Sequence, residues 1–259
     1  MTIIASVKVQ DGIALGCDSA TQVSGRDPEG KIGVFKVYQN AKKLFQFGNL
    51  PLGLLTYGIG NIGKKSIRTV IREFEKGYDF SSNKAYQVKD VAEELLGFMQ
   101  NAYDKEYLQL DKENQPALGF FISGYSSNSS LGEEWEFVIP AQKEVKLVRP
   151  KEQFGSSWRG IAVPFTRLYH GFDPRAINEL QESGVSADII KRLKENYGAK
   201  IIYDGMPIKD ALNFVEFILK TTIGLSSFEI GAPVCSEPVQ IAVIDEDGFE
   251  WIKKPTLGG

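Results

Sequence analysis

Histidine is almost absent from this sequence, since His170 is the only one among 259 residues. A serine–histidine–aspartate triad would have to be built around that side chain, and the sequence has no Gly-X-Ser-X-Gly elbow. Cysteine is scarce too, because Cys17 and Cys235 are too few for a disulfide framework. Two distant cysteines and one histidine are also too few ligands for a zinc site. We therefore expect no metal and interpret both cysteines as small buried residues.

Long hydrophobic runs and clusters of basic charge are missing as well. No apolar stretch approaches the ~20 residues that span a bilayer, and the N-terminus lacks the features of a signal peptide. The formal net charge is −3 and the isoelectric point is about 5.5. Because lysine and arginine are spread along the chain, we expect neither nucleic-acid binding nor a polybasic membrane anchor. The expected location is the cytoplasm.

Strand and helix patterns occur in separate blocks. Apolar residues recur at helical spacing in two segments that should each lie on a sheet face: Ile67, Val70, Ile71, Phe74; and Val88, Val91, Leu95, Met99. Strands are predicted over the first 58 residues, at 117–156 and at 239–252, and a mostly helical stretch at 159–223. Segregated blocks favour an α+β fold. No repeat or linker divides the chain, so we expect one domain, 1–259, with a helical insertion around 172–205.

One glycine motif invites a nucleotide-binding interpretation. Residues 58–63, Gly-Ile-Gly-Asn-Ile-Gly, match G-x-G-x-x-G and precede a predicted helix. A lone match is weak, and Asp79 is not convincingly placed as the acidic partner of a dinucleotide site. We therefore expect no cofactor, and interpret these glycines as a turn that passes close to another backbone or to a substrate.

The N-terminus offers a different kind of nucleophile. Thr2 follows the initiator methionine, and removal of Met1 would give Thr2 a free α-amine. An α-amine titrates close to neutrality, so a neutral fraction at pH 7 can serve as the general base for the threonine hydroxyl. A hairpin turned at Asp11-Gly12 would bring Asp18 back beside Thr2. A threonine at position 2 is uninformative by itself.

Three sequence segments make Thr2 informative when they are taken together. Residues 1–21 carry a threonine directly after Met1, turn at Asp-Gly and end in an acidic residue with a small polar cluster. Residues 40–47 read Asn-Ala-Lys-Lys-Leu-Phe-Gln-Phe, and residues 57–60 read Tyr-Gly-Ile-Gly. In order and spacing they resemble proteasome β subunits, which are N-terminal nucleophile (Ntn) hydrolases. The resemblance covers the first 75 residues well and returns weakly at 236–252. It indicates a divergent bacterial or archaeal member.

This resemblance implies a fold and an activity. The fold would be a four-layer αββα sandwich, in which two antiparallel sheets are flanked by helices. The activity would be that of a threonine-type endopeptidase acting on polypeptides, within a homo-oligomeric ring that works with an ATP-dependent unfoldase.

The resemblance also implies a role for each site residue. Thr2 would be the nucleophile. Lys43 would favour its neutral amine and the alkoxide, and Asp18 would pair with Lys43. The Gly58 N–H would face the oxyanion. Each residue also has a structural interpretation: Asp18 as a turn cap, Lys43 as a solvent-facing strand residue and Gly58 as a turn glycine.

The sequence departs from the family at three places. Residues 160–164, Gly-Ile-Ala-Val-Pro, lack the serine that the family carries near the nucleophile. Residues 222–231 lack its Asp-x-x-Ser motif, for which Ser226 or Ser227 would substitute, and the loop 22–34 is longer than in a compact β subunit. Two alternatives therefore remain open: a non-catalytic ring or scaffold subunit, and an Ntn amidase of a small amide.

Overall fold

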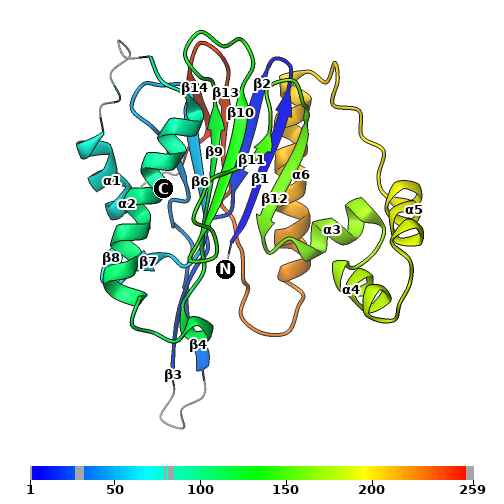
Figure 1. The fold of residues 1–259 in the computed structure, drawn as a ribbon. Helices are drawn as coiled ribbons and strands as arrows, with labels where there is room; N and C mark the ends of the chain where they lie inside the picture. The colour runs from blue at the N-terminus through cyan, green and yellow to red at the C-terminus, as the bar shows by residue number, and fades with distance from the viewer. Residues whose placement is uncertain (1, 27–31, 79, 81–84, 255–259) are drawn as a thin grey trace.

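Two five-stranded sheets form the centre of the protein in the computed structural model, which describes residues 2–26, 32–78, 80 and 85–254 (Figure 1). The first sheet has the order β12-β1-β2-β13-β14, and the second has the order β11-β10-β9-β6-β5. All neighbouring strands in both sheets are antiparallel. The strands of the first sheet are β1 (Ile3–Val9), β2 (Gly12–Cys17), β12 (Gly155–Gly160), β13 (Gln240–Ile244) and β14 (Phe249–Lys253). Those of the second are β5 (Leu44–Gln46), β6 (Leu52–Gly58), β9 (Leu118–Gly124), β10 (Glu133–Ile139) and β11 (Lys146–Arg149).

The helices lie on both sides of this pair of sheets. Figure 1 shows α1 and α2 on one side, and α6 with α3, α4 and α5 on the other. Their bounds are α1 (Ile67–Gly77), α2 (Val88–Tyr107), α3 (Val163–His170), α4 (Pro174–Glu182), α5 (Ala187–Tyr197) and α6 (Ile208–Ser226), with a 3₁₀ turn η1 (Lys112–Asn114). None of the described helices is both long and apolar enough to cross a membrane.

Three hydrophobic clusters connect these elements. The first joins α1 and α2 to the second sheet, and it buries every residue of both predicted helical stripes. The second packs α6 and α3 against the first sheet, through residues such as Val215, Leu219 and Phe165. The third contains residues of both sheets, among them Leu15 and Phe121. This arrangement of antiparallel sheets and helices confirms the α+β class.

Two predicted segments differ in detail from the sequence analysis. The long segment 22–34 belongs to an extra hairpin, formed by β3 (Thr21–Arg26) and β4 (Ile32–Tyr38), whose tip at 27–31 lies outside the described residues. The helical stretch predicted from residue 159 begins only at Val163, because residues 155–160 pair with β1 as a strand. The glycine motif 58–63 ends β6 and enters a small hairpin, β7 (Asn61–Ile62) and β8 (Lys65–Ser66).

Candidate active site

The β1–β2 hairpin brings Asp18 to the start of β1, as its Asp-Gly turn predicts. In the hairpin register Ile4 lies opposite Cys17, and the Asp18 N–H donates to the Ile3 carbonyl at 3.1 Å. In return, the Ile3 N–H donates to Asp18 Oδ1 at 3.1 Å. This carboxylate is therefore fixed next to the residue that follows Thr2.

Lys43 and Asp18 form a buried ion pair, as the family resemblance implies. Lys43 Nζ lies 2.7 Å from Asp18 Oδ1, and the two side chains are 8% and 0% exposed. The second carboxylate oxygen, Oδ2, accepts from the backbone N–H groups of Ala20 at 2.9 Å and Ser236 at 3.3 Å. Four donors thus satisfy one buried carboxylate, which is the condition under which a charge can be buried at acceptable cost.

Thr2 is 4% exposed and sits where β1 meets β12. Its carbonyl accepts a hydrogen bond from the Ile161 N–H at 2.8 Å, in the turn where the resemblance to proteasome β subunits would place a serine. Gly160 precedes this turn with φ of +86°, and a Cβ built there would lie 1.9 Å from the Thr2 carbonyl oxygen. Only glycine therefore fits beside Thr2 without moving it.

Gly58 ends β6 with φ of +98°, and a Cβ there would lie 2.3 Å from the Ala117 carbonyl oxygen. Close approach to a neighbouring backbone is what the sequence analysis expected of this turn. Gly58, Thr2 and Lys43 all line one pocket of about 810 Å³, whereas Asp18 lies behind Lys43 and does not line it. Three of the four sequence-predicted residues therefore line one cavity, and the fourth, Asp18, forms the ion pair with Lys43.

The sequence analysis missed several residues of the site. The backbone N–H of Ser236 donates to Asp18. The hydroxyls of Ser226 and Ser227, the candidate substitutes for the serine of the family's Asp-x-x-Ser motif, bond to other groups. The Ser226 hydroxyl accepts from the Val234 N–H at 3.3 Å, and the Ser227 hydroxyl donates to the Gly224 carbonyl at 2.8 Å. Backbone groups of a loop leave no signal in residue type, so Ser236 could not have been found from pattern alone.

A second missed feature is a carboxylate that links the two strands beside the pocket. Glu136 Oε1 accepts from the Tyr57 hydroxyl at 2.5 Å, and Glu136 accepts from the Arg159 guanidinium at 2.7 and 3.0 Å. Tyr57 directly precedes Gly58, and Arg159 directly precedes Gly160. Burial and then the hydrogen bond to Glu136 raise the pKa of Tyr57, so its hydroxyl stays a donor.

Glu136→Gln is expected to lower the free energy of unfolding by about 1–3 kcal/mol, because a buried charge-assisted bond is replaced by a weaker neutral one. Urea denaturation measures the change. The control is Glu93→Gln, whose carboxylate pairs with Lys89 while both side chains are 51% exposed. This control should lower the free energy of unfolding by about 0.5 kcal/mol or less. Equal decreases in the two variants would show that the Glu136 hydrogen bonds stabilise the protein no more than an exposed ion pair does.

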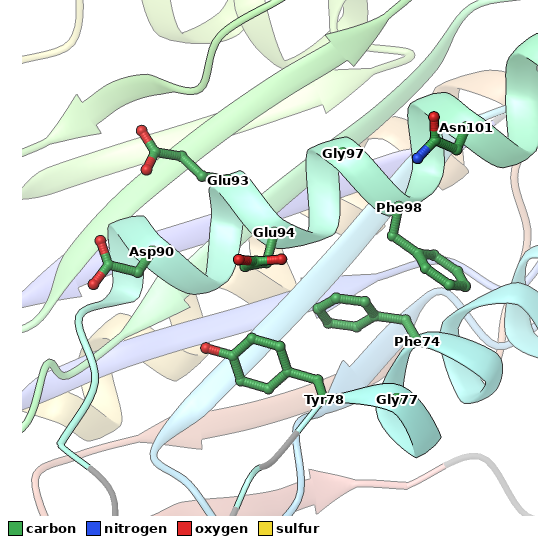
Figure 2. A pocket seen from close by; sticks show the side chains of 9 residues that line it. All are labelled: Phe74, Gly77, Tyr78, Asp90, Glu93, Glu94, Gly97, Phe98 and Asn101. Atoms are coloured by element: carbon green, nitrogen blue, oxygen red, sulfur yellow. The ribbon is translucent and has the colours of Figure 1, made fainter.

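A second pocket, of about 650 Å³, lies between the end of α1 and α2 (Figure 2). It presents carboxylates at Asp90, Glu93 and Glu94, and Figure 2 shows the rings of Phe74 and Phe98 side by side. Serine, threonine, cysteine and lysine are all missing from its described lining, so it offers none of the usual nucleophiles of acyl transfer. The Thr2 pocket is the better candidate for chemistry.

Other reactive groups are poorly placed for catalysis. Cys17 and Cys235 are 0% and 2% exposed, which confirms that both are buried. Burial raises the pKa of both thiols, that of Cys235 to about 11, so neither is a thiolate near neutral pH. Within the described residues, no group of three or more histidine, cysteine, aspartate or glutamate side chains could hold a metal ion.

Comparison with known proteins rests on structure. No protein-family model matches the chain, and no curated protein matches it in sequence. Anbu (ancestral beta-subunit) from Yersinia bercovieri matches 97% of this chain and 88% of its own, with 12% identity and a TM-score of 0.57. The helical assembly of the Anbu complex from Pseudomonas aeruginosa matches 98% and 88%, with 15% identity and a TM-score of 0.57.

A third solved structure, the Anbu (Gly-1) mutant from Hyphomicrobium sp. strain MC1, matches 100% of this chain and 89% of its own, with 12% identity and a TM-score of 0.57. At such low identity, a likeness over nearly the whole of both chains is evidence about fold. The chain therefore has the fold of these ancestral beta-subunits, in agreement with the proteasome-like fold that its first 75 residues resemble.

Proposed function

We propose that this chain is a proteasome-like subunit with threonine-type endopeptidase activity, whose nucleophile is Thr2 after removal of Met1. The two sheets with helices on both sides would then be the four-layer αββα sandwich of Ntn hydrolases. The observation that carries the proposal is the buried Lys43–Asp18 pair, with Lys43 opening onto the same cavity as Thr2. A positive charge held at the wall of a cavity favours the deprotonated form of a neighbouring nucleophile and its base.

Acylation begins when Thr2 Oγ attacks the carbonyl carbon of the scissile peptide bond and its proton passes to the neutral Thr2 α-amine. The carbonyl oxygen becomes an oxyanion, which the Gly58 N–H stabilises. When this intermediate collapses, the C–N bond breaks and the ammonium returns its proton to the leaving nitrogen. An ester between the acyl group and Thr2 remains.

Deacylation consumes one water molecule. Water attacks the ester carbonyl and gives a proton to the α-amine, and the C–Oγ bond then breaks as that proton returns to Oγ. The positive charge of Lys43 favours the neutral amine and the alkoxide throughout. Asp18 acts as a positioning residue, because all hydrogen bonds of its carboxylate among the described residues come from Lys43 and from backbone N–H groups.

A peptide vinyl sulfone tests the proposal, since a threonine Oγ adds to its double bond and leaves a stable ether. We expect intact mass to show loss of Met1 and one adduct, which peptide mapping assigns to Thr2. Thr2→Ala should give no adduct; the protonated thiols of Cys17 and Cys235 are not expected to compete. Retention of Met1 together with an unlabelled Thr2 would refute the proposal.

That negative outcome would instead favour a non-catalytic ring or scaffold subunit. The turn that contacts Thr2 through Ile161 has no serine, and this departure from the family is the observation on the side of that alternative. If small amides were hydrolysed and unfolded casein were not, the protein would be an Ntn amidase.

The assembly that we propose is a homo-oligomer that receives polypeptides from an ATP-dependent unfoldase. Its support is the fold shared with Anbu, for which a helical assembly is known from Pseudomonas aeruginosa. Light scattering on the purified protein would give the expected mass of several copies, and a mass of 28.7 kDa would contradict the assembly.

A further inference from the structure

The Thr2 pocket has an unbalanced set of charges. Its described lining includes the cations Lys42, Lys43 and Arg68, whereas none of its described lining residues is acidic. The rest of the wall is neutral, with residues such as Thr56 and Ile59. A half-enclosed cavity with one sign of charge concentrates ligands of the opposite sign.

Only one of these cations forms an ion pair with a described carboxylate. Lys43 is paired with Asp18, but no carboxylate of the described residues lies within ion-pair distance of Lys42 or Arg68. The Lys42 amine lies 5.1 Å from the ring centre of Phe45 and 5.6 Å from that of Trp251. Lys42 and Arg68 line the same pocket, and burial, and then the positive charges of Arg68, Arg72 and Lys254, lower the pKa of Lys42. Glu75 acts in the opposite direction and raises the pKa of Lys42, but it forms no ion pair with it within 4 Å.

Arg68 carries an unsatisfied donor at this wall. Its Nε is buried and has no hydrogen-bond partner among the described residues. Arg68 lies in the first turn of α1, which contains no acidic residue and is capped by the Ser66 hydroxyl. A buried donor without an acceptor is costly, and a carboxylate matches the planar fork of a guanidinium with two parallel bonds.

We propose that the pocket recognises an acidic side chain of the substrate, so that Thr2 preferentially cleaves beside aspartate or glutamate in a polypeptide. This inference rests on the proposed function, because it names the substrate class of the same site. Lys42 and Arg68 would bind the carboxylate, and Lys43 would remain committed to Asp18. In the free chain no described carboxylate lies within ion-pair distance of Lys42 or Arg68, and the substrate would supply that anion.

The experiment compares three peptide vinyl sulfones that differ only in the residue beside the reactive group: glutamate, glutamine or lysine. Glutamine has the shape of glutamate without its charge. We expect the glutamate probe to modify Thr2 at least tenfold faster than the glutamine probe, with the lysine probe slowest. In Arg68→Gln the glutamate-to-glutamine ratio should fall to about threefold or less.

Arg72→Gln is the matched control, since Arg72 lies one turn further along α1, is exposed and does not line the pocket. Its positive charge also acts on Lys42, so this variant removes a nearby charge without removing the guanidinium that lines the pocket. Its ratio should stay at tenfold or more. Lys42→Gln provides a second pocket variant if Arg68→Gln fails to fold. Equal rates for glutamate and glutamine in the unmodified protein, or equal ratios in the Arg68 and Arg72 variants, would overturn the inference while leaving the nucleophile intact.

Binding without chemistry separates the two proposals completely. An acetylated peptide with a central glutamate should bind Thr2→Ala at least tenfold more tightly than its glutamine counterpart in calorimetry. If no probe modifies Thr2 but this preference holds, the catalytic proposal fails and the acidic ligand class stands. If Thr2 is modified but binding shows no preference, the ligand class is wrong.

Discussion

Asp18→Ala is expected to lower the free energy of unfolding by about 3–5 kcal/mol, the usual cost of removing one partner from a buried ion pair. The substitution leaves the Lys43 ammonium buried without its counter-ion. It also removes the acceptor for the N–H groups of Ile3, Ala20 and Ser236, which come from three separate segments. Urea denaturation of the two proteins measures the difference, and modification of Thr2 by the vinyl sulfone should be lost.

Lys43→Met separates the ion pair from the backbone contacts. Methionine fills a similar volume, and the Asp18 carboxylate keeps its three backbone donors, so we expect a loss about 1–2 kcal/mol smaller than in Asp18→Ala. Modification of Thr2 should still be lost, because the charge on Lys43 is gone. If Lys43→Met were the more damaging change to stability, the carboxylate would not organise the three segments as we infer.

Gly160→Ala is expected to cost about 3 kcal/mol or more, because two effects add. Residues other than glycine are strained at its φ of +86°, and the new Cβ would meet the Thr2 carbonyl oxygen at 1.9 Å. The contact can be relieved only if β12 or Thr2 moves. We therefore expect both a lower urea midpoint and a slower modification of Thr2.

Gly184→Ala is the control that measures backbone strain at positive φ without a steric contact. Gly184 has a similar φ of +80°, but a Cβ there would meet nothing within 4 Å. This variant should cost about 1–2 kcal/mol and leave Thr2 as reactive as before. Similar losses of Thr2 reactivity in both variants would exclude close contact with Gly160 as the cause.

The sequence predicted those parts of the site that depend on local pattern. The Asp-Gly turn and the strand pattern around it place Asp18 at the start of β1, because a hairpin register follows from its turn. The prediction of apolar stripes on α1 and α2 was also correct, because one face of each helix is buried and this leaves a local spacing pattern in the sequence. The pairing of Lys43 with Asp18 came from family resemblance, and its geometry agrees with that expectation.

The remaining contacts join segments that are distant in sequence. Gly160 reaches Thr2 because β12 pairs with β1, and Ser236 reaches Asp18 from the loop after α6. Glu136 joins Tyr57 to Arg159 across two different sheets. No periodicity or motif encodes which distant strands become neighbours, so these residues could be recognised only in three dimensions.

The peptide group between Thr2 and Ile3 is hydrogen-bonded at both its carbonyl and its N–H. The carbonyl of Thr2 accepts from Ile161, and the N–H of Ile3, on the other side of the same peptide bond, donates to Asp18. Both hydrogen bonds are made by atoms on the C-terminal side of the Met1–Thr2 bond, where the proposed removal of Met1 would take place. Removal of Met1 would therefore expose an α-amine that is already held in position. Maturation would require hydrolysis of the Met1–Thr2 peptide bond but no refolding of the site.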